Sequence, residues 1–234
     1  MARTFLKMND YTWQQQVLPI YHFEQLASTN ETAWELFQQG KTPPFLVTAA
    51  EQTAGKGQWG RQWVSSRGGL YLSLLLTPHW AIEQPSHLTI SSVFGVTEIL
   101  ASYQIPIEIK WLNDLFLQRK KLGGILTETR VKNRDLKAVV IGIGVNWSNV
   151  VPEMGIALKD YLEASQIETY FHPSPALKLG SHQFYFPPKL INFHHLKYIV
   201  ITGLLWGYQR YSQEGLTHIL PQYEARLIQS SPTN

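Results

Sequence analysis

The sequence contains no cysteine among its 234 residues. Disulfide bonds, cysteine-ligated zinc and a thiol nucleophile are therefore excluded. Charged residues are scarce too, at 16% against 44% hydrophobic residues, which is typical of a globular enzyme and not of a disordered chain. The formal net charge of +3 is mild, and it indicates attraction to anionic ligands without committing the chain to nucleic acid.

Long apolar runs are also missing. Polar side chains interrupt residues 1–20, so no apolar core of signal-peptide length forms there. The longest apolar stretch, residues 198–208, is too short to cross a bilayer. We therefore expect no membrane association and a cytoplasmic location.

Signatures of several enzyme classes are absent. No G-x-S-x-G elbow supports a serine hydrolase. The adjacent His194 and His195 have no carboxylate at ligand spacing, which favours a packing or surface role over a metal site.

What the sequence does contain is a glycine-rich loop, residues 55–63, with the sequence GKGQWGRQW. Its glycines let the backbone approach an anion, and Lys56 and Arg61 add positive charge. A dinucleotide fingerprint would open a helix at this point, and a Walker A motif would need Gly-Lys-Ser/Thr, so neither applies. The loop suggests phosphate handling, although such a loop alone is more often a plain hairpin connection.

Apolar spacing and turn residues predict the order of the elements. The predicted strands are residues 20–26, 45–47, 70–76, 107–111, 115–117, 122–129 and 137–146, and the predicted helices are 29–39, 85–103, 158–164, 193–213 and 216–227. We expect Ser28 and Glu31 to form a capping box and Pro221 to interrupt the last helix. The chain reads as a single domain, with residues 1–19 as an extension and residues 165–190 as an irregular excursion.

Four separated stretches carry a family resemblance. They are Ser28-Thr29-Asn30, the loop with the preceding Glu51 and Gln52, residues 110–114 (KWLND) with residues 121–126 (KLGGIL), and residues 141–146 (IGIGVN). In this order and spacing they resemble the catalytic domain of biotin–protein ligases, strongly over residues 23–149 and loosely over residues 150–227. The resemblance implies an α+β fold with a mixed β-sheet flanked by helices, related to lipoate ligases and class II aminoacyl-tRNA synthetases.

The resemblance also implies a two-step reaction with biotin, ATP and Mg²⁺. Biotin is first activated as biotinyl-5′-adenylate and then transferred to a lysine of a biotin carboxyl carrier domain of acetyl-CoA carboxylase. No winged helix precedes the predicted catalytic domain, so no DNA partner is expected. Too few residues follow it for a small SH3-like barrel, and a homodimer stays open.

The site residues follow from matches to the family pattern. Lys121 is the first choice of catalytic residue, with Asp114 and Lys110 beside it, and Asp114 is also placed at the Mg²⁺ position. The matched biotin-binding positions are Ser28, Thr29, Asn30, Gln52, Lys56, Gly57, Gln58 and Lys121. The matched ATP or adenylate positions are Gly55, Arg61, Trp63, Asn113, Gly124 and Asn146.

Each assignment has a structural alternative. Ser28 could only cap its helix, Asp114 could only cap a turn, Trp63 could be plain core, Lys110 could only form an ion pair, and Lys121 could be an ordinary hairpin lysine.

The sequence departs from the family pattern at Gln58 and Trp59 in the loop, which replace two arginines that many members carry. It also departs at Leu112, which stands where the family's KWPND carries proline. Two other functions stay open: a lipoate–protein ligase, and a nucleic-acid-binding module that uses Trp59 and Trp63 as stacking platforms.

Overall fold

The computed structural model of the protein describes residues 12–13, 16–78, 84–132, 135–165, 178–179, 182–183 and 191–228. At its centre lies a seven-stranded sheet with the order β3-β4-β5-β9-β8-β7-β6. β3 (Ile20–Phe23) and β4 (Phe45–Ala49) are parallel, and the remaining neighbours in this sheet are antiparallel. The mixed sheet expected from the resemblance is therefore confirmed.

The other elements match the predicted order closely. The remaining strands of the sheet are β5 (Leu70–Leu76), β6 (Glu108–Lys110), β7 (Asp114–Leu117), β8 (Lys120–Lys132) and β9 (Asp135–Val145). The helices are α1 (Thr29–Gln38), the 3₁₀ turn η1 (Gln58–Gly60), α2 (Pro85–Ser102), α3 (Leu158–Ala164), α4 (Phe193–Glu214) and α5 (Leu216–Glu224). β1 (Thr12–Trp13) pairs with β2 (Gln16–Val17), and β10 (Lys178–Leu179) pairs with β11 (His182–Gln183).

Two predicted segments lie mainly outside the residues that the structure describes. Apart from the short strands β1, β2, β10 and β11 and a few flanking residues, the extension at 1–19 and the excursion at 165–190 lie outside the described residues. The division into one domain with these two appendages stays a prediction.

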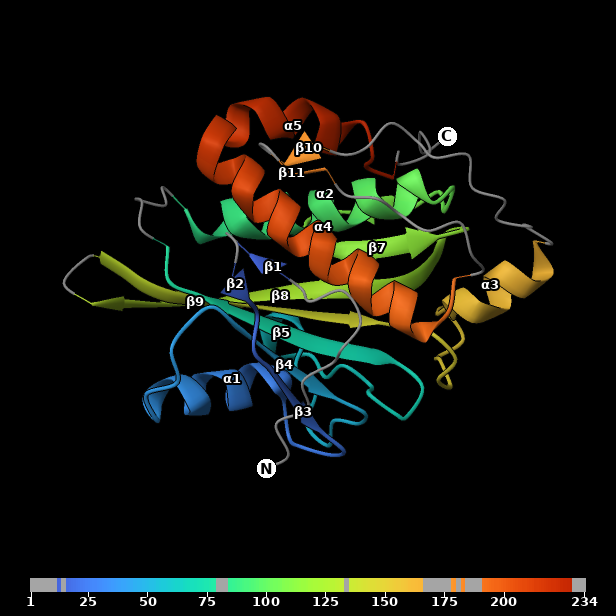
Figure 1. Cartoon of the computed structure of the whole chain (residues 1–234). Helices are drawn as coiled ribbons and strands as arrows, with labels where there is room; N and C mark the ends of the chain where they lie inside the picture. Colours follow the sequence, from blue (N-terminus) through green and yellow to red (C-terminus); the bar gives the residue numbers. More distant parts are fainter. Residues whose placement is uncertain are drawn as a thin grey trace.

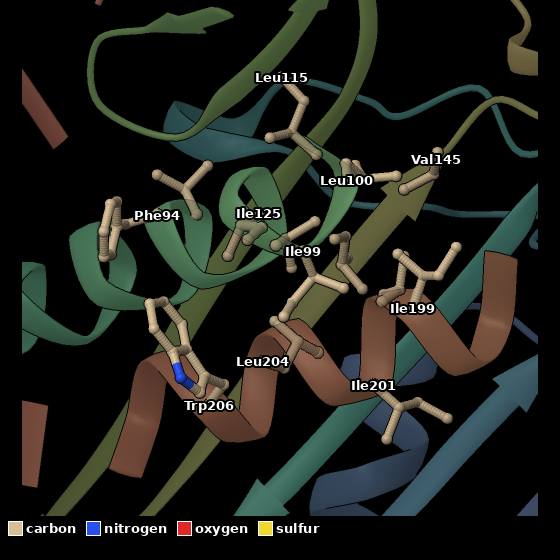
Figure 2. Packing of buried hydrophobic residues seen from close by; sticks show 14 of the residues in the cluster. Phe94, Ile99, Leu100, Leu115, Ile125, Val145, Ile199, Ile201, Leu204 and Trp206 are labelled. Carbon is tan, nitrogen blue, oxygen red and sulfur yellow. The ribbon is translucent and has the colours of Figure 1, made fainter. Parts of the chain in front are cut away.

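The helices cover the sheet on both faces (Figure 1). α2 and α4 pack on one face, where they bury the larger apolar cluster. Figure 2 shows Ile99 of α2, Leu204 of α4 and Ile125 of β8 among the residues of this cluster. α1 lies on the other face, where Ala33 and Trp34 pack with strand residues in a smaller cluster. No helix within the described ranges combines the length and apolar character that a bilayer-spanning segment needs.

α2 and α4 cross at glycines, so their backbones are in direct contact. A Cβ atom on Gly203 would lie 2.6 Å from the Cα of Val96 and 3.0 Å from the carbonyl oxygen of Gly95. Both obstacles are backbone atoms, so neither can rotate away. The core next to the sheet therefore depends on the absence of side chains at this crossing.

We expect Gly203→Ala to destabilise the protein by about 1–3 kcal/mol, the usual cost of overpacking. The direction of the change in stability separates two effects. Helix propensity alone would make alanine more stable than glycine by about 1 kcal/mol, so a loss of stability must come from the crowded crossing. Urea unfolding followed by circular dichroism measures the difference. Ser212→Ala, an exposed change on the same helix, should leave the unfolding midpoint nearly unchanged; equal midpoints for both variants would contradict the role given to the crossing.

The predicted interruption of the last helix at Pro221 is wrong, because α5 runs through this residue. A proline removes one backbone hydrogen bond, yet Ile219 and Tyr223 on either side of it are fully buried and hold the helix against the core. Beyond α5 the chain covers the edge of the sheet. The amide of Ile109 in β6 donates to Arg226, and the amide of Ile228 donates back to Ile109.

Candidate active site

Residues from α1, the glycine-rich loop, β7, β8 and β9 surround one cavity. Its lining comprises Ser28, Thr29, Asn30, Gln52, Lys56, Gly57, Gln58, Arg61, Gln62, Trp63, Asn113, Asp114, Lys121, Gly124, Ile125, Leu126, Gly142, Ile143 and Gly144. Most of the side chains matched to the family pattern are therefore brought together, although they come from segments far apart in the chain.

One end of the cavity is built from uncharged hydrogen-bonding groups. The amide of Thr29 donates to Oε1 of Gln52 at 2.8 Å, and the Thr29 hydroxyl donates to the same oxygen at 3.1 Å. Nε2 of Gln52 donates to Oγ of Ser65 at 2.8 Å, which in turn donates to the carbonyl of Trp63 at 3.0 Å. The Gln52 side chain is thus fixed at both its oxygen and its nitrogen.

Ser73 supports this end from beneath, and the sequence analysis did not identify it. Its hydroxyl lies 2.8 Å from Oγ1 of Thr29 and 2.6 Å from Oδ1 of Asn30, and its side chain is fully buried in β5. The available signal was a lone serine inside the aliphatic run LYLSLLL, because a buried hydroxyl needs a hydrogen-bond partner.

The predicted capping box is wrong. Ser28 has the extended backbone of an N-cap residue, but its side chain makes no capping hydrogen bond and is buried at the cavity. Glu31 points to the loop instead, where its carboxylate lies 2.6 Å from Nζ of Lys56. The Glu31 carboxylate therefore pairs with the charged Lys56 of the facing loop, and not with the backbone N–H of Ser28 that a capping box would use.

The ion pair joins α1 to a loop that has hydrogen bonds of its own. The Gly57 amide donates to the carbonyl of Arg61 at 2.7 Å, and the Trp63 amide donates to Gly55 at 2.9 Å. The hydrogen bond with Glu31 raises the pKa of Lys56 above its ordinary value, so the lysine is protonated at neutral pH. The Lys56–Glu31 pair therefore holds the loop against the first turn of α1.

We expect Glu31→Gln to loosen this loop in the absence of ligand. Exposed ion pairs contribute about 0.2–1 kcal/mol, so chymotrypsin cleavage of the loop should become roughly two- to fivefold faster. Glu35→Gln, an exposed change on the same helix, should leave the rate as it is. Identical cleavage rates for all three proteins would show that the pair does not hold the loop.

The other end of the cavity is cationic. Nζ of Lys121 lies 2.7 Å from Oδ2 of Asp114 and 5.4 Å from the ring centroid of Trp63. The hairpin turn before it consists of Gln118 and Arg119, both at positive φ, and β8 already begins at Lys120. Lys121 is therefore a strand residue held by backbone pairing. It does not lie in the hairpin turn itself, where the alternative of an ordinary hairpin lysine would place it.

Glycines form the floor of the cavity, as expected from close backbone approach. A Cβ atom on Gly142 would collide with the Asn30 side chain, and one on Gly144 would collide with the Trp63 indole. Nε1 of Trp63 is buried without a hydrogen-bond partner among the described residues. Trp63 therefore lines the cavity with an indole N–H that is available to an acceptor on a ligand.

Three matched residues do not line the cavity. Lys110 is exposed, with its Nζ 5.6 Å from the Phe116 ring centroid. Asn146 is buried behind the cavity, where its amide contacts the Lys121 carbonyl at 3.4 Å, and Gly55 lies behind Gln52.

No group of three or more His, Asp or Glu side chains able to hold a metal occurs in the part of the chain that the structure describes. Asp114 is the carboxylate in the cavity lining, and it is paired with Lys121.

Known proteins are similar to this chain over the same segments that form the cavity. The model of the Biotin/lipoate A/B protein ligase family matches residues 22–146. The bifunctional ligase/repressor BirA of Bacillus subtilis is 37% identical over 143 residues, which cover 60% of this chain and 44% of BirA. A biotin–[acetyl-CoA-carboxylase] ligase of Paracoccus denitrificans is 34% identical over 131 residues, covering 55% and 54% of the two chains. The chain thus spans about half the length of these curated relatives.

Similarity in fold extends further than similarity in sequence. The biotin protein ligase from Aquifex aeolicus, solved in complex with biotin and ATP, superposes with a TM-score of 0.66 at 23% identity, covering 89% of this chain and 78% of the other. A biotin protein ligase from Leishmania major, solved with biotinyl-5-AMP, gives a TM-score of 0.63 at 20% identity, with 92% and 85% covered.

Proposed function

We propose, because this chain belongs to the biotin/lipoate A/B protein ligase family, that it activates biotin with ATP and transfers it to a lysine of a biotin carboxyl carrier domain. The carrier domain of an acetyl-CoA carboxylase is the proposed partner, as the name of the Paracoccus relative suggests. One observation supports biotin in particular: the cavity joins an uncharged hydrogen-bonding end to a cationic end, which suits a ligand with a ureido ring and a carboxylate.

In the first step a carboxylate oxygen of biotin attacks the α-phosphorus of ATP. A new P–O bond forms, the bond to the bridging oxygen breaks, and pyrophosphate leaves. In the second step the lysine ε-amine attacks the acyl carbon of the adenylate, the C–O bond breaks, AMP leaves and the amine loses a proton. Both steps develop negative charge at phosphate or acyl oxygens.

Lys121 supplies the positive charge that the first step requires. Two anions must approach each other, so a cation between them stabilises the transition state more than either reactant alone. Asp114 and Trp63 fix the ammonium group in position before the ligands arrive. Arg61 on the loop provides further charge for phosphate oxygens, whereas the charge of Lys56 is offset by Glu31.

The residues at the other end suit the ureido ring. Thr29, Asn30 and Gln52 offer hydroxyl and amide groups that can donate to the ureido oxygen and accept from its N–H groups. The dithiolane ring of lipoate offers neither kind of group, so the second side-chain N–H of Asn30 and of Gln52 would have no acceptor on it. The lipoate alternative is therefore less consistent with the cavity.

Magnesium is proposed to enter with ATP as part of the substrate. Mg²⁺ is usually held by one or two carboxylates together with substrate phosphates, and a single carboxylate, Asp114, meets that pattern. The ion would neutralise phosphate charge, while Asp114 would orient both the ion and Lys121.

The nucleic-acid alternative depends on two tryptophans that do not share a surface. Trp63 lines the cavity beside Lys121, whereas Trp59 does not line it. Together they form no continuous stacking platform of the kind that single strands require. The absence of DNA binding and the cytoplasmic location remain predictions from the sequence, and a homodimer stays open.

Incorporation of labelled biotin into a purified carrier domain tests the proposal. We expect label in the carrier only with ATP and Mg²⁺ present, and none when the acceptor lysine is replaced by arginine. Incorporation of lipoate at a comparable rate, or no incorporation of biotin, would contradict it.

A further inference from the structure

Trp59 is the most exposed large hydrophobic side chain among the described residues, with 90% of its surface accessible. It lies at the tip of the glycine-rich loop, in η1, with φ 58° and ψ 35°. Glycine adopts this left-handed conformation at little cost, whereas a bulky aromatic residue is an outlier there. A large apolar ring is therefore exposed to water at a position whose backbone conformation also disfavours it. This combination does not help the chain to fold, and it points to a role in function.

The indole is turned away from the cavity. Gln58 before it and Arg61 after it both line the cavity, while Trp59 does not. The turn between them is fixed, because the Arg61 amide donates to the Gln58 carbonyl at 3.2 Å and the Gly57 amide donates to Arg61 at 2.7 Å. Trp59 is thus displayed at the mouth of the cavity and faces outward.

A small-molecule ligand that enters the cavity would leave such a ring in water. The second step of the proposed reaction, however, brings a folded protein to this mouth. Its lysine must reach the acyl carbon near Lys121, so the backbone of the acceptor lies within one lysine side chain of the cavity. The loop that carries Trp59 lies between the cavity and an acceptor that approaches from this side.

We propose, on the basis of the function proposed above, that Trp59 is the docking anchor for the carrier domain. Tryptophan is strongly enriched among residues that dominate interface energetics, because it buries a large area with few rotatable bonds. The preformed turn that carries Trp59 also favours binding, because the loop loses little conformational freedom when a partner docks.

Other occupants fit less well. A symmetric contact with a second copy of the chain, centred on Trp59, would bring two copies of the exposed cation Arg61 together. A single nucleic-acid strand would need a neighbouring aromatic surface, and Trp63 is turned into the cavity. A carrier domain that presents its lysine to the cavity can bury this ring without either difficulty, because neither a second copy of Arg61 nor a second aromatic surface is needed.

Three substitutions separate the side chain from the backbone. Trp59→Ala and Trp59→Gly both remove the ring, and glycine also removes any conformational cost at positive φ. Trp59→Phe keeps a flat apolar ring. Val131→Ala is the matched control, because Val131 is 61% exposed and lies at the far end of β8 from Lys121.

Each variant is assayed for biotin-dependent pyrophosphate exchange, for adenylate consumption by hydroxylamine, and for transfer to a purified biotin carboxyl carrier domain. We expect Trp59→Ala and Trp59→Gly to lower kcat/KM for the carrier by about tenfold or more, which corresponds to 1.4 kcal/mol. Exchange and hydroxylamine consumption should stay within about twofold of wild type, and Trp59→Phe should retain most of the transfer.

Carrier kcat/KM unchanged in Trp59→Ala would overturn the inference, as would an equal fall in exchange, which would place Trp59 in the first step. A change in sedimentation of the free protein without a change in transfer would assign the ring to a contact between copies. If the wild-type protein shows no biotin-dependent pyrophosphate exchange, that result counts against the proposed function and not against the docking role of Trp59. Calorimetric titration of the carrier domain into wild type and Trp59→Ala still tests docking in that case: a tenfold difference in Kd supports it and equal values reject it.

Discussion

Replacement of Lys121 by alanine is expected to lower the rate of adenylate formation by about 10²- to 10³-fold, the usual loss for one donor aimed at developing charge. The ammonium group lies at the cationic end of the cavity, where its ion pair with Asp114 at 2.7 Å holds it in position. Single-turnover formation of the adenylate, measured with biotin and MgATP in excess, reports the step directly.

Lys120 provides the matched control, because it is the neighbouring lysine in β8 and its side chain is exposed. Lys120→Ala should retain adenylate formation, while Lys121→Arg should recover only part of the rate, since a guanidinium group cannot occupy the position of a compact ammonium. Near wild-type formation in Lys121→Ala, with an unchanged unfolding midpoint, would remove Lys121 from the reaction.

The second large effect is expected for Gly142→Ala. The added Cβ would lie 2.9 Å from Cγ of Asn30, so the amide must move and lose its 2.6 Å contact with the Ser73 hydroxyl. Leaving such groups unpaired costs about 1–3 kcal/mol, so KM for biotin should rise by roughly 10- to 100-fold. KM for MgATP should change little, because Gly142 lies at the uncharged end of the cavity.

Ile141→Val controls for damage to the strand itself. Ile141 is fully buried next to Gly142 in β9, and its truncation costs about 0.5–1.5 kcal/mol of stability without touching the cavity. If both variants raise KM for biotin equally, the effect comes from a weakened β9, and the account of the uncharged end is wrong.

Much of the fold and of the cavity could be predicted because short local patterns encode them. Aliphatic runs bounded by glycine and proline predicted the strands close to their observed positions, and the helix predicted over residues 193–213 matches α4 (Phe193–Glu214). The site segments could be named because Lys121, Gly142 and the loop each belong to a stretch whose spacing is set by one turn or one strand. A resemblance in those stretches therefore carries over directly to the cavity.

Pairings between distant segments could not be predicted in this way. Glu31 has the right spacing to reach back to its own helix start, and only the folded loop brings Lys56 to within 2.6 Å of it. Ser73 reads as one more residue of an apolar strand until Thr29 and Asn30 are placed above it. Lys110 illustrates the converse: its stretch matches the family pattern except at Leu112, yet the strand directs the Lys110 side chain to solvent.

The central claim is that this cavity joins biotin to the α-phosphate of ATP. Exchange of labelled pyrophosphate into ATP by the purified chain tests it most directly, because the exchange requires formation and reversal of the adenylate and needs no carrier. We expect exchange that depends on biotin and Mg²⁺, is lost in Lys121→Ala, and is not supported by lipoate or octanoate. Exchange that proceeds equally well without biotin, or that lipoate supports better than biotin, would contradict it.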